Sequence, residues 1–217
     1  MKVSKTAHII LGAPDENASF PDPLKGDIVI GVDGGAIKCL EKNIGLTMAV
    51  GDFDSISMEE KEKLEATGAL LHEYEADKDD TDAEIALALA MEDETVHHIR
   101  MYNWTGGRLD HLMSILFMVY QPRFQEKMEH VTLVNQINTI SFYSPGKYTL
   151  EKEEAKKYLS FIGLTPIDQL ILKQVKYPLK RKSYSYPVAL ISNEFLEQEC
   201  CFSFEKGVVA VIQSTDK

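Results

Sequence analysis

Short apolar runs alternate with helical patterns through about the first 130 residues, and no other feature limits the possible folds as strongly. Four runs are typical of strands that end at or before Gly, Asp or Asn: residues 7–11, 27–32, 47–50 and 96–102. Helical patterns separate them at residues 36–42, 58–67 and 81–92. Strands that alternate with helices predict a mostly parallel sheet in a doubly wound α/β domain.

The pattern at residues 81–92 is the clearest helix in the sequence. Thr81 and Glu84 form a Thr-x-x-Glu capping box, and Asp82 adds a second acidic group at the positive end of the helix. The apolar stripe that we expect to be buried consists of Ile85, Ala88 and Leu89.

From about residue 131 the pattern changes to short β-rich runs separated by Pro, Gly, Asn or Asp. The runs are residues 131–134, 139–143, 147–150, 158–162, 170–175, 188–191, 200–204 and 208–213. This spacing favours a small antiparallel sandwich or barrel, of which we expect the β-sandwich, with the basic run Lys180-Arg181-Lys182 in a solvated loop. We therefore expect an α/β domain over residues 1–135 and a β-sandwich domain over residues 136–217.

Charge and apolar run length exclude two classes of partner. The net charge of −11 argues against a nucleic-acid footprint. No apolar run approaches the roughly 20 residues that cross a bilayer, and the N-terminus lacks the architecture of a signal peptide. The three cysteines, Cys39, Cys200 and Cys201, have no metal-ligand spacing and are expected to be reduced. These observations predict a cytoplasmic protein.

Four loops rich in Asp and Gly each follow a strand or a strand-like run. They are DGGA at residues 33–36, GDFDS at 51–55, DKDDTD at 77–82 and TGGRLDH at 105–111. In an open parallel sheet, ligands bind beyond the carboxyl ends of the strands. We therefore expect the four loops to meet at one edge of the sheet.

The aspartates of these loops predict a cation site. On an extended segment Asp52 and Asp54 would face the same way, about 6.6 Å apart. Two carboxylates at about 4 Å repel by roughly 4 kcal/mol at an effective dielectric of 20, so convergence of Asp33, Asp52, Asp54 and Asp82 needs a cation. Hard oxygen ligands favour Mg²⁺, which substrate phosphates and waters complete.

Glycine pairs in two of the loops suit an anionic ligand. Gly34-Gly35 and Gly106-Gly107 allow close approach of backbone N–H groups, and each pair precedes a helical pattern. Neither pair forms a P-loop or a dinucleotide-binding motif, and either alone also fits an ordinary turn. Arg108 can hold phosphate oxygens in a bidentate manner or form a surface ion pair with Asp110.

Together the motifs resemble those of thiamine pyrophosphokinases in order and approximate spacing. Two further motifs in the β-rich half, KYPL at residues 176–179 and ISNE at 191–194, look like the thiamine-domain motifs of that family. The chain departs from the family pattern at three places. Ile37, Ala76 and Gln174-Val175 stand where Asn, Pro and Gly-Leu are frequent.

The resemblance implies a transfer of the pyrophosphoryl group of ATP to the hydroxyl of thiamine, by a homodimer whose thiamine pockets lie between subunits. It implies Mg²⁺ as cofactor, held by Asp52, Asp54 and Asp82 with Asp33 close by. The implied ATP-binding residues are Asp33, Gly34, Gly35, Lys78, Asp79, Thr81, Gly107 and Arg108. The implied thiamine-binding residues are Asp110, Tyr177, Ser192 and Asn193, and the implied catalytic residues are Asp54, Asp82, Arg108 and Asp110. Either Asp82 or Asp110 would accept the hydroxyl proton.

Two other interpretations fit part of the sequence. A phosphatase of the haloacid dehalogenase type uses D-x-D-x-[TS], which Asp52 and Asp54 approach, but Ile56 stands at the hydroxyl position. An EF-hand loop beginning at Asp77 requires Gly at position 82 and Glu at 88, where the chain has Asp82 and Ala88. His111 is expected to pack at the start of a helix rather than to act as a base.

Overall fold

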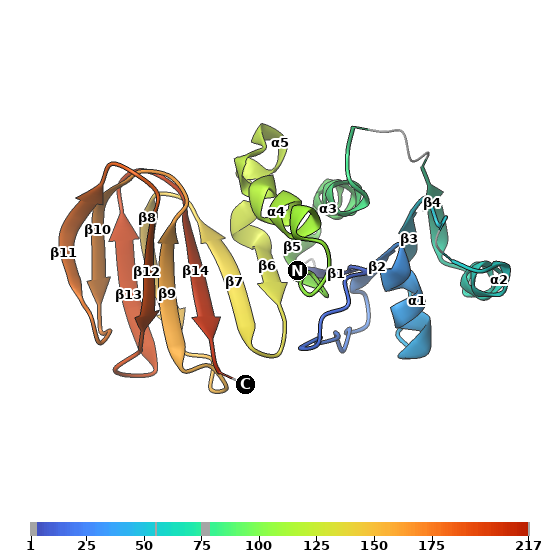
Figure 1. The fold of residues 1–217 in the computed structure, drawn as a ribbon, viewed down its shortest axis with the longest axis horizontal. Helices are drawn as coiled ribbons and strands as arrows, with labels where there is room; N and C mark the ends of the chain where they lie inside the picture. The colour runs from blue at the N-terminus through green and yellow to red at the C-terminus, as the bar shows by residue number, and fades with distance from the viewer. Residues whose placement is uncertain (1–3, 55, 75–78, 217) are drawn as a thin grey trace. The chain divides into compact units, whose positions relative to one another are not determined.

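The computed structural model describes residues 4–54, 56–74 and 79–216 (Figure 1). The chain divides into two compact units, Met1–Asn135 and Gln136–Lys217. Each unit is described by itself.

The first unit contains a parallel sheet, as predicted. Its strands are β1 (Lys5–Ile10), β2 (Ile28–Val32), β3 (Met48–Gly51), β4 (Leu70–Glu73), β5 (Val96–Tyr102) and β6 (Val131–Val134), in the order β6-β5-β1-β2-β3-β4. Every adjacent pair in this order is parallel. The carboxyl ends of the strands therefore lie at one edge.

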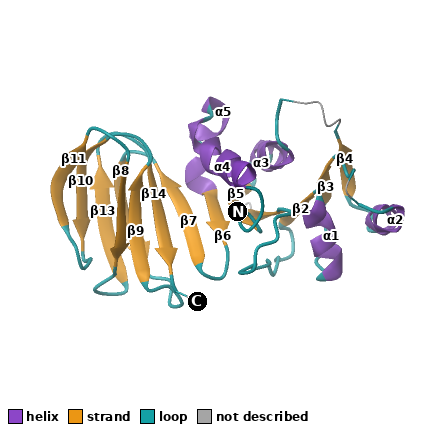
Figure 2. Cartoon of the chain, viewed as in Figure 1, coloured by secondary structure: helices purple, strands orange, loops and turns teal. Residues whose placement is uncertain are grey.

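Helices cover both faces of this sheet. They are α1 (Gly34–Glu41), α2 (Met58–Ala66), α3 (Asp82–Glu92), α4 (Leu109–Phe117) and α5 (Pro122–Gln125), with short 3₁₀ turns at Met118–Tyr120 and Met128–His130. Figure 2 shows α1 and α3 on opposite sides of the strands. Because both faces are covered, the central strands are nearly continuous apolar runs, with Ile9, Ile30 and Met101 almost completely buried.

The capping box at α3 is confirmed, but the predicted buried stripe is wrong. The Thr81 hydroxyl accepts from the Glu84 N–H, and the Glu84 carboxylate accepts from the Thr81 N–H. The buried residues of α3 are Glu84, Ala86, Leu87, Ala90 and Met91, whereas Ile85, Ala88 and Leu89 are only half-buried. At about 100° per residue, Ala86, Leu87, Ala90 and Met91 lie on nearly the opposite side of the helix from the predicted stripe, so the buried face of α3 is the one opposite to that expected.

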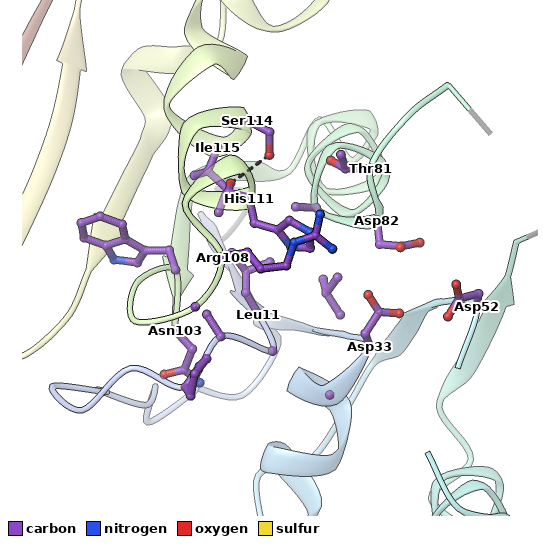
Figure 3. Close-up of a pocket in the computed structure, with 18 of the residues that line it drawn as sticks. Leu11, Asp33, Asp52, Thr81, Asp82, Asn103, Arg108, His111, Ser114 and Ile115 are labelled. Carbon is purple, nitrogen blue, oxygen red and sulfur yellow. Dashed lines mark hydrogen bonds between the residues drawn. The ribbon is translucent and has the colours of Figure 1, made fainter. Parts of the chain in front are cut away.

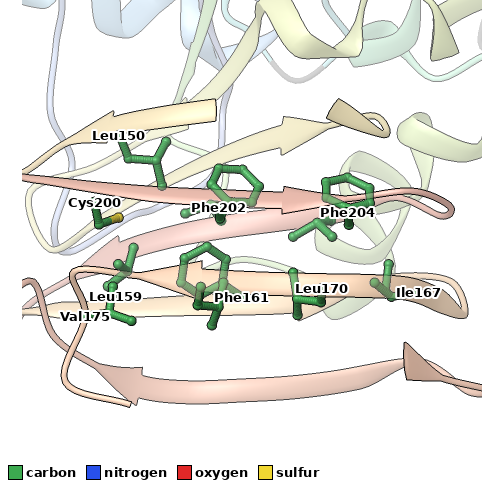
Figure 4. Packing of buried hydrophobic residues seen from close by; sticks show 12 residues of the cluster. Leu150, Leu159, Phe161, Ile167, Leu170, Val175, Cys200, Phe202 and Phe204 are labelled. Atoms are coloured by element: carbon green, nitrogen blue, oxygen red, sulfur yellow. The ribbon is translucent and has the colours of Figure 1, made fainter. Parts of the chain in front are cut away.

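The second unit is an antiparallel β-sandwich, as predicted. One sheet has the order β12-β9-β14-β7 and the other β11-β10-β13-β8. The strands are β7 (Asn138–Tyr143), β8 (Gly146–Glu151), β9 (Tyr158–Gly163), β10 (Ile167–Lys173), β11 (Leu179–Tyr184), β12 (Val188–Asn193), β13 (Glu199–Phe204) and β14 (Val209–Ser214). Alternate residues of both sheets form the core, in which Phe161, Phe202 and Phe204 are almost completely buried (Figure 4).

Residues 131–134 form β6, which pairs in parallel with β5 and lies in the first unit, within the range 1–135 expected for the α/β domain. One assignment in the β-rich half is wrong. Lys180-Arg181-Lys182 lies in strand β11 rather than in a loop, and β11 is the end strand in the order β11-β10-β13-β8, where it pairs with β10. Lysine is frequent on edge strands because its charge opposes further strand pairing, which explains how a basic run forms a strand.

A buried polar cluster joins β1 and β5 to the residue that precedes β2. His8 is buried, with Nδ1 3.2 Å from the Tyr102 hydroxyl and Nε2 3.3 Å from Asp27 Oδ2. Burial lowers the pKa of His8, and the charge of Arg100 lowers it further against the opposing effect of Asp27. The folded chain therefore favours neutral His8.

We expect the free energy of unfolding to decrease as the pH falls below the unfolded-state pKa of histidine, about 6.5. Below that pH, His8 binds a proton in the unfolded chain more readily than in the folded chain, where burial lowers its pKa. In His8→Gln, the loss of stability between about pH 7.5 and about pH 5.5, measured by urea unfolding, should be smaller than in the unmodified chain. His111→Gln, at an exposed position, should lose the same stability between these two pH values as the unmodified chain. Equal losses in all three proteins would contradict the role of His8.

No helix among the described residues is long and apolar enough to cross a membrane.

Candidate active site

A hollow of about 680 Å³ lies in the first unit at the carboxyl edge of its sheet (Figure 3). It is lined by residues 11–14 after β1, 32–34 after β2, Asp52 after β3, 79–83 at the start of α3, 103, 104, 107 and 108 after β5, and His111, Ser114 and Ile115 of α4. The described parts of the four predicted loops therefore contribute to one site, as the parallel sheet requires.

Three of the predicted metal ligands share this hollow. The carboxylates of Asp33, Asp52 and Asp82 face the same space, and Arg108 approaches it from the α4 side (Figure 3). All three aspartates are half-buried. The acidic and basic groups thus lie on opposite sides of the space in which a ligand would bind.

The last residue of β3 determines where Asp33 can lie. Asp33 has a φ of 46° at the N-cap of α1, and its N–H donates to the Val50 carbonyl at 2.9 Å. A Cβ atom at Gly51 would lie 1.9 Å from Asp33 Oδ1. The glycine of GDFDS therefore provides the room that the aspartate of DGGA occupies.

Asp54 lies elsewhere, because the chain does not stay extended after β3. Phe53 has a φ of 52° and is buried against Ala36, Ala49 and Leu64, which forces a turn. Asp54 is exposed and outside the lining of the hollow, and its N–H donates to Asp52 Oδ1 at 3.1 Å. The expected extended arrangement of Asp52 and Asp54 is wrong.

The Asp-rich loop is anchored by a contact that the sequence analysis missed. Asp79, Thr81 and Asp82 line the hollow, while Lys78 lies outside the described residues. Asp80 accepts two hydrogen bonds from Arg123 Nη1 and Nη2, both at 2.7 Å, and these hold the pKa of Asp80 below its ordinary value. Arg123 is 43 residues away, so no local pattern indicates the pair.

Arg108 forms an ion pair with Asp110. This is one of the two roles that the sequence allows for Arg108, the other being to bind phosphate. Arg108 Nε donates to Asp110 Oδ1 at 3.1 Å and Nη2 to Oδ2 at 2.6 Å, and the side chains are 72% and 63% exposed. The hydrogen bonds from Arg108 hold the pKa of Asp110 below its ordinary value. Because water screens an exposed pair, a phosphate can compete for the guanidinium. Arg108 lines the hollow and Asp110 does not.

The glycines have different roles. Gly34 and Gly107 line the hollow, where they leave backbone open to a ligand. Gly35 is buried, and a Cβ atom there would lie 2.0 Å from the Ile10 carbonyl oxygen. Gly35 therefore allows α1 to pack closely on β1 and lies beneath the hollow rather than in it.

Several lining residues were not predicted. Residues 11–14 follow the first strand without an acidic or glycine-rich motif, so nothing in the pattern marks them. Asn103 and Trp104 are buried, and among the described residues Asn103 Oδ1, Asn103 Nδ2 and Trp104 Nε1 have no hydrogen-bond partner. His111 is exposed and lines the hollow, so the expectation that it packs at the start of a helix is wrong.

The donor set suits a magnesium ion that phosphates complete. Within the described ranges, no three His, Cys, Asp or Glu side chains are close enough together to hold a metal by themselves. The three carboxylates facing the hollow are hard oxygen donors, and Mg²⁺ is usually held by one or two protein carboxylates plus waters and substrate phosphates. The residues therefore fit this ion.

Three of the four predicted thiamine-binding residues, Tyr177, Ser192 and Asn193, belong to the second unit, whereas Asp110 lies on α4 of the first. Asn193 is buried, and its Oδ1 accepts from the Tyr177 N–H at 2.9 Å while its Nδ2 donates to the Tyr177 carbonyl at 3.0 Å. Tyr177 is 59% exposed, and Ser192, with a φ of 59°, is also exposed. Asn193 therefore holds the backbone that presents the ring of Tyr177.

Comparison with known proteins places both units in one family. Residues 24–132 match the model of the thiamin pyrophosphokinase catalytic domain, and residues 147–209 match the thiamin pyrophosphokinase vitamin B1 binding domain. Thiamine pyrophosphokinase from Bacillus subtilis (strain 168) is 36% identical over 98% of this chain and 100% of that protein.

Solved structures similar to this chain include members of the same family. A thiamin pyrophosphokinase family protein from Enterococcus faecalis is 38% identical, with a TM-score of 0.93 over 99% of this chain and 100% of that one. Yeast thiamin pyrophosphokinase, at 13% identity and a TM-score of 0.74 over 98% of this chain and 87% of that one, shares the fold. The phosphatase alternative finds no support in these comparisons, and the chain belongs to the thiamin pyrophosphokinase family.

Proposed function

We propose that the chain transfers the pyrophosphoryl group of ATP to the hydroxyl of thiamine, giving thiamine diphosphate and AMP. The observation that carries this proposal is the hollow in which three carboxylates face Arg108, in a chain of this family. Phosphoryl-type transfer asks little covalent chemistry of the protein, so positioning and charge stabilisation suffice.

We assign the ATP phosphates to the hollow. Mg²⁺ held by one or two of Asp33, Asp52 and Asp82, together with waters and the phosphates, would neutralise the phosphate charge, and Asp54 is the further metal ligand that the family resemblance implies. Backbone at Gly34 and Gly107 and the side chain of Arg108 would contact the phosphates. Lys78, Asp79 and Thr81 would complete the nucleotide site, with Gly35 supporting it from below.

The proposed reaction moves one proton and exchanges one bond. The thiamine hydroxyl oxygen attacks the β-phosphorus, the bond to the oxygen bridging the α- and β-phosphates breaks, and AMP leaves. Asp82 or Asp110 accepts the hydroxyl proton. Arg108 holds down the pKa of Asp110, so when Arg108 turns to the phosphates Asp110 becomes a stronger base.

We propose a homodimer, because each unit exposes apolar residues that a second copy would cover. On α4, Leu109, Met113 and Phe117 recur every four residues and are 70%, 39% and 53% exposed. In the second unit, Tyr177 and Ile191 are 59% and 67% exposed. Thiamine would bind between the α/β unit of one subunit and Tyr177, Ser192 and Asn193 of the other, with Asp110 near it.

The free thiols of Cys39, Cys200 and Cys201 support a cytoplasmic location for the reaction.

We expect purified protein with ATP, Mg²⁺ and thiamine to form AMP and thiamine diphosphate in equal amounts, because one bond exchange produces both. Chromatography of the nucleotides and thiamine esters measures the two products together. The matched control omits thiamine and should yield no AMP. Formation of ADP with thiamine monophosphate would refute the pyrophosphoryl transfer, and nucleotide cleavage that is independent of thiamine would refute the substrate.

A further inference from the structure

The second unit has a hollow of its own, of about 410 Å³, on the outer face of the sheet β11-β10-β13-β8. Its charged lining residues are all basic: Lys147 of β8, Lys173 of β10 and Arg181 of β11. Thr149, Cys201 and Ser203 lie between them and offer two hydroxyls and a thiol. This volume lies within the range of small-molecule sites, roughly 300–1,000 Å³.

The strand register directs the basic residues toward one place. Ser203 pairs with Lys147 on one side and with Ile171 on the other, and Cys201 pairs with Thr149 and with Lys173. Lys147 and Lys173 are therefore two strand spacings apart across the sheet and two residues apart along it, roughly 12 Å in all, with Ser203 and Cys201 between them. Both side chains are long enough to reach an anion placed there.

A β-bulge brings the third basic residue to the same face. Leu170 pairs with Lys182 and Leu172 with Leu179, so the register shifts between them and β11 carries an extra residue. Arg181 lies in this bulge with a φ of 50°. Bulges redirect side chains and are frequent beside binding sites. Arg181, which lies in this bulge, is one of the residues that line the hollow.

The charges are not neutralised within the part of the chain that the structure describes. Lys147, Lys173 and Arg181 form none of the ion pairs found among these residues. The acidic residues nearest by position in the strands are Glu151 and Glu199, one row beyond Thr149 and Cys201, and Glu205, two residues after Ser203, and none of the three lines the hollow. A basic hollow on a chain of net charge −11 is a local exception that favours an anion.

We propose that this hollow binds a small phosphate-bearing anion of the size of inorganic pyrophosphate, without a metal ion. Three cations and two hydroxyls supply the donors that phosphate oxygens accept. The site lies outside the lining of the hollow assigned to ATP, and its residues come from the second unit alone.

Cys201 allows the proposal to be tested at the site itself. Cys201 is half-buried in the lining of the hollow, whereas Cys39 and Cys200 are buried. Burial raises the pKa of the Cys39 and Cys200 thiols to about 12, which keeps these two residues unreactive. In EDTA at constant ionic strength, inorganic pyrophosphate should slow alkylation of Cys201 by N-ethylmaleimide, with peptide mass spectrometry as the readout. EDTA removes the metal that pyrophosphate would need in the acidic hollow, so failure here is distinct from failure of the proposed transferase activity.

Matched variants distinguish binding in this hollow from a general effect of positive charge on the protein surface. Lys173→Gln with Arg181→Gln should raise the pyrophosphate concentration for half-protection at least tenfold, while Lys180→Gln with Lys182→Gln, an equal change of charge on the same edge strand, should leave it unchanged. Lys147→Gln alone provides a milder variant if the first pair does not fold. Absence of protection in the unmodified chain, or equal weakening in both double variants, would overturn the proposal.

Discussion

Asp82→Asn is expected to lower kcat by about 10²–10³-fold, the usual effect of removing one group that stabilises transition-state charge. Asp82 is the first residue of α3, lines the hollow and faces the space shared with Asp33 and Asp52 (Figure 3). Asparagine keeps the shape and removes the charge. Because the capping box of Thr81 and Glu84 remains, the melting temperature should change little. Steady-state kinetics at saturating ATP and thiamine measure the loss.

Two further variants make this result decisive. Asp22→Asn removes the same charge from an exposed loop position outside the hollow and should leave kcat unchanged. Asp54→Asn tests the metal role that the family resemblance implies for an exposed residue outside the lining. A loss comparable to that of Asp82→Asn would place Asp54 in the metal site, and near-normal turnover would remove it. Near-normal turnover of Asp82→Asn itself would contradict our assignment of the site.

Gly35→Ala is expected to destabilise the chain by about 3 kcal/mol or more, the upper range for overpacking a core. The added Cβ atom would lie 2.0 Å from the Ile10 carbonyl oxygen and 2.7 Å from its carbon. Both are backbone atoms of a central strand, which cannot move aside as a flexible side chain can. Urea unfolding of the two proteins measures the difference in free energy.

Gly45→Ala is the matched control for this substitution. A Cβ atom at Gly45 would have no other atom within 4 Å, so the change should alter stability by no more than about 0.5 kcal/mol. If both variants unfold at the same urea concentration as the unmodified chain, the close packing of α1 on β1 is not needed for stability.

The sequence predicts the fold well wherever one local pattern determines an element. The β5 prediction at residues 96–102 matches its observed bounds, and the Thr81 capping box marks the start of α3. The parallel arrangement follows from the alternation, and with it the meeting of the loops at one edge. The buried stripe of α3 was wrong because periodicity gives a face of the helix but not the angle at which the sheet meets it.

The site was less predictable where distant residues decide the geometry. Phe53 belongs to a core cluster with Leu64, and this long-range packing turns the chain away from the extended path assumed for Asp52 and Asp54. The pairing of Asp80 with Arg123 depends on how α5 packs near α3, which no local pattern shows. Asn103 lies in the lining because it directly follows β5, not because of a motif.

The glycine at the end of β3 links two loops that are separate in the sequence. Any side chain at position 51 would displace the Asp33 carboxylate, and Asp33 in turn keeps its position only while that space stays open. In related chains, therefore, residues 33 and 51 should be inherited as a pair. A chain that loses the glycine should also lose the aspartate, even if every other residue of both loops is retained.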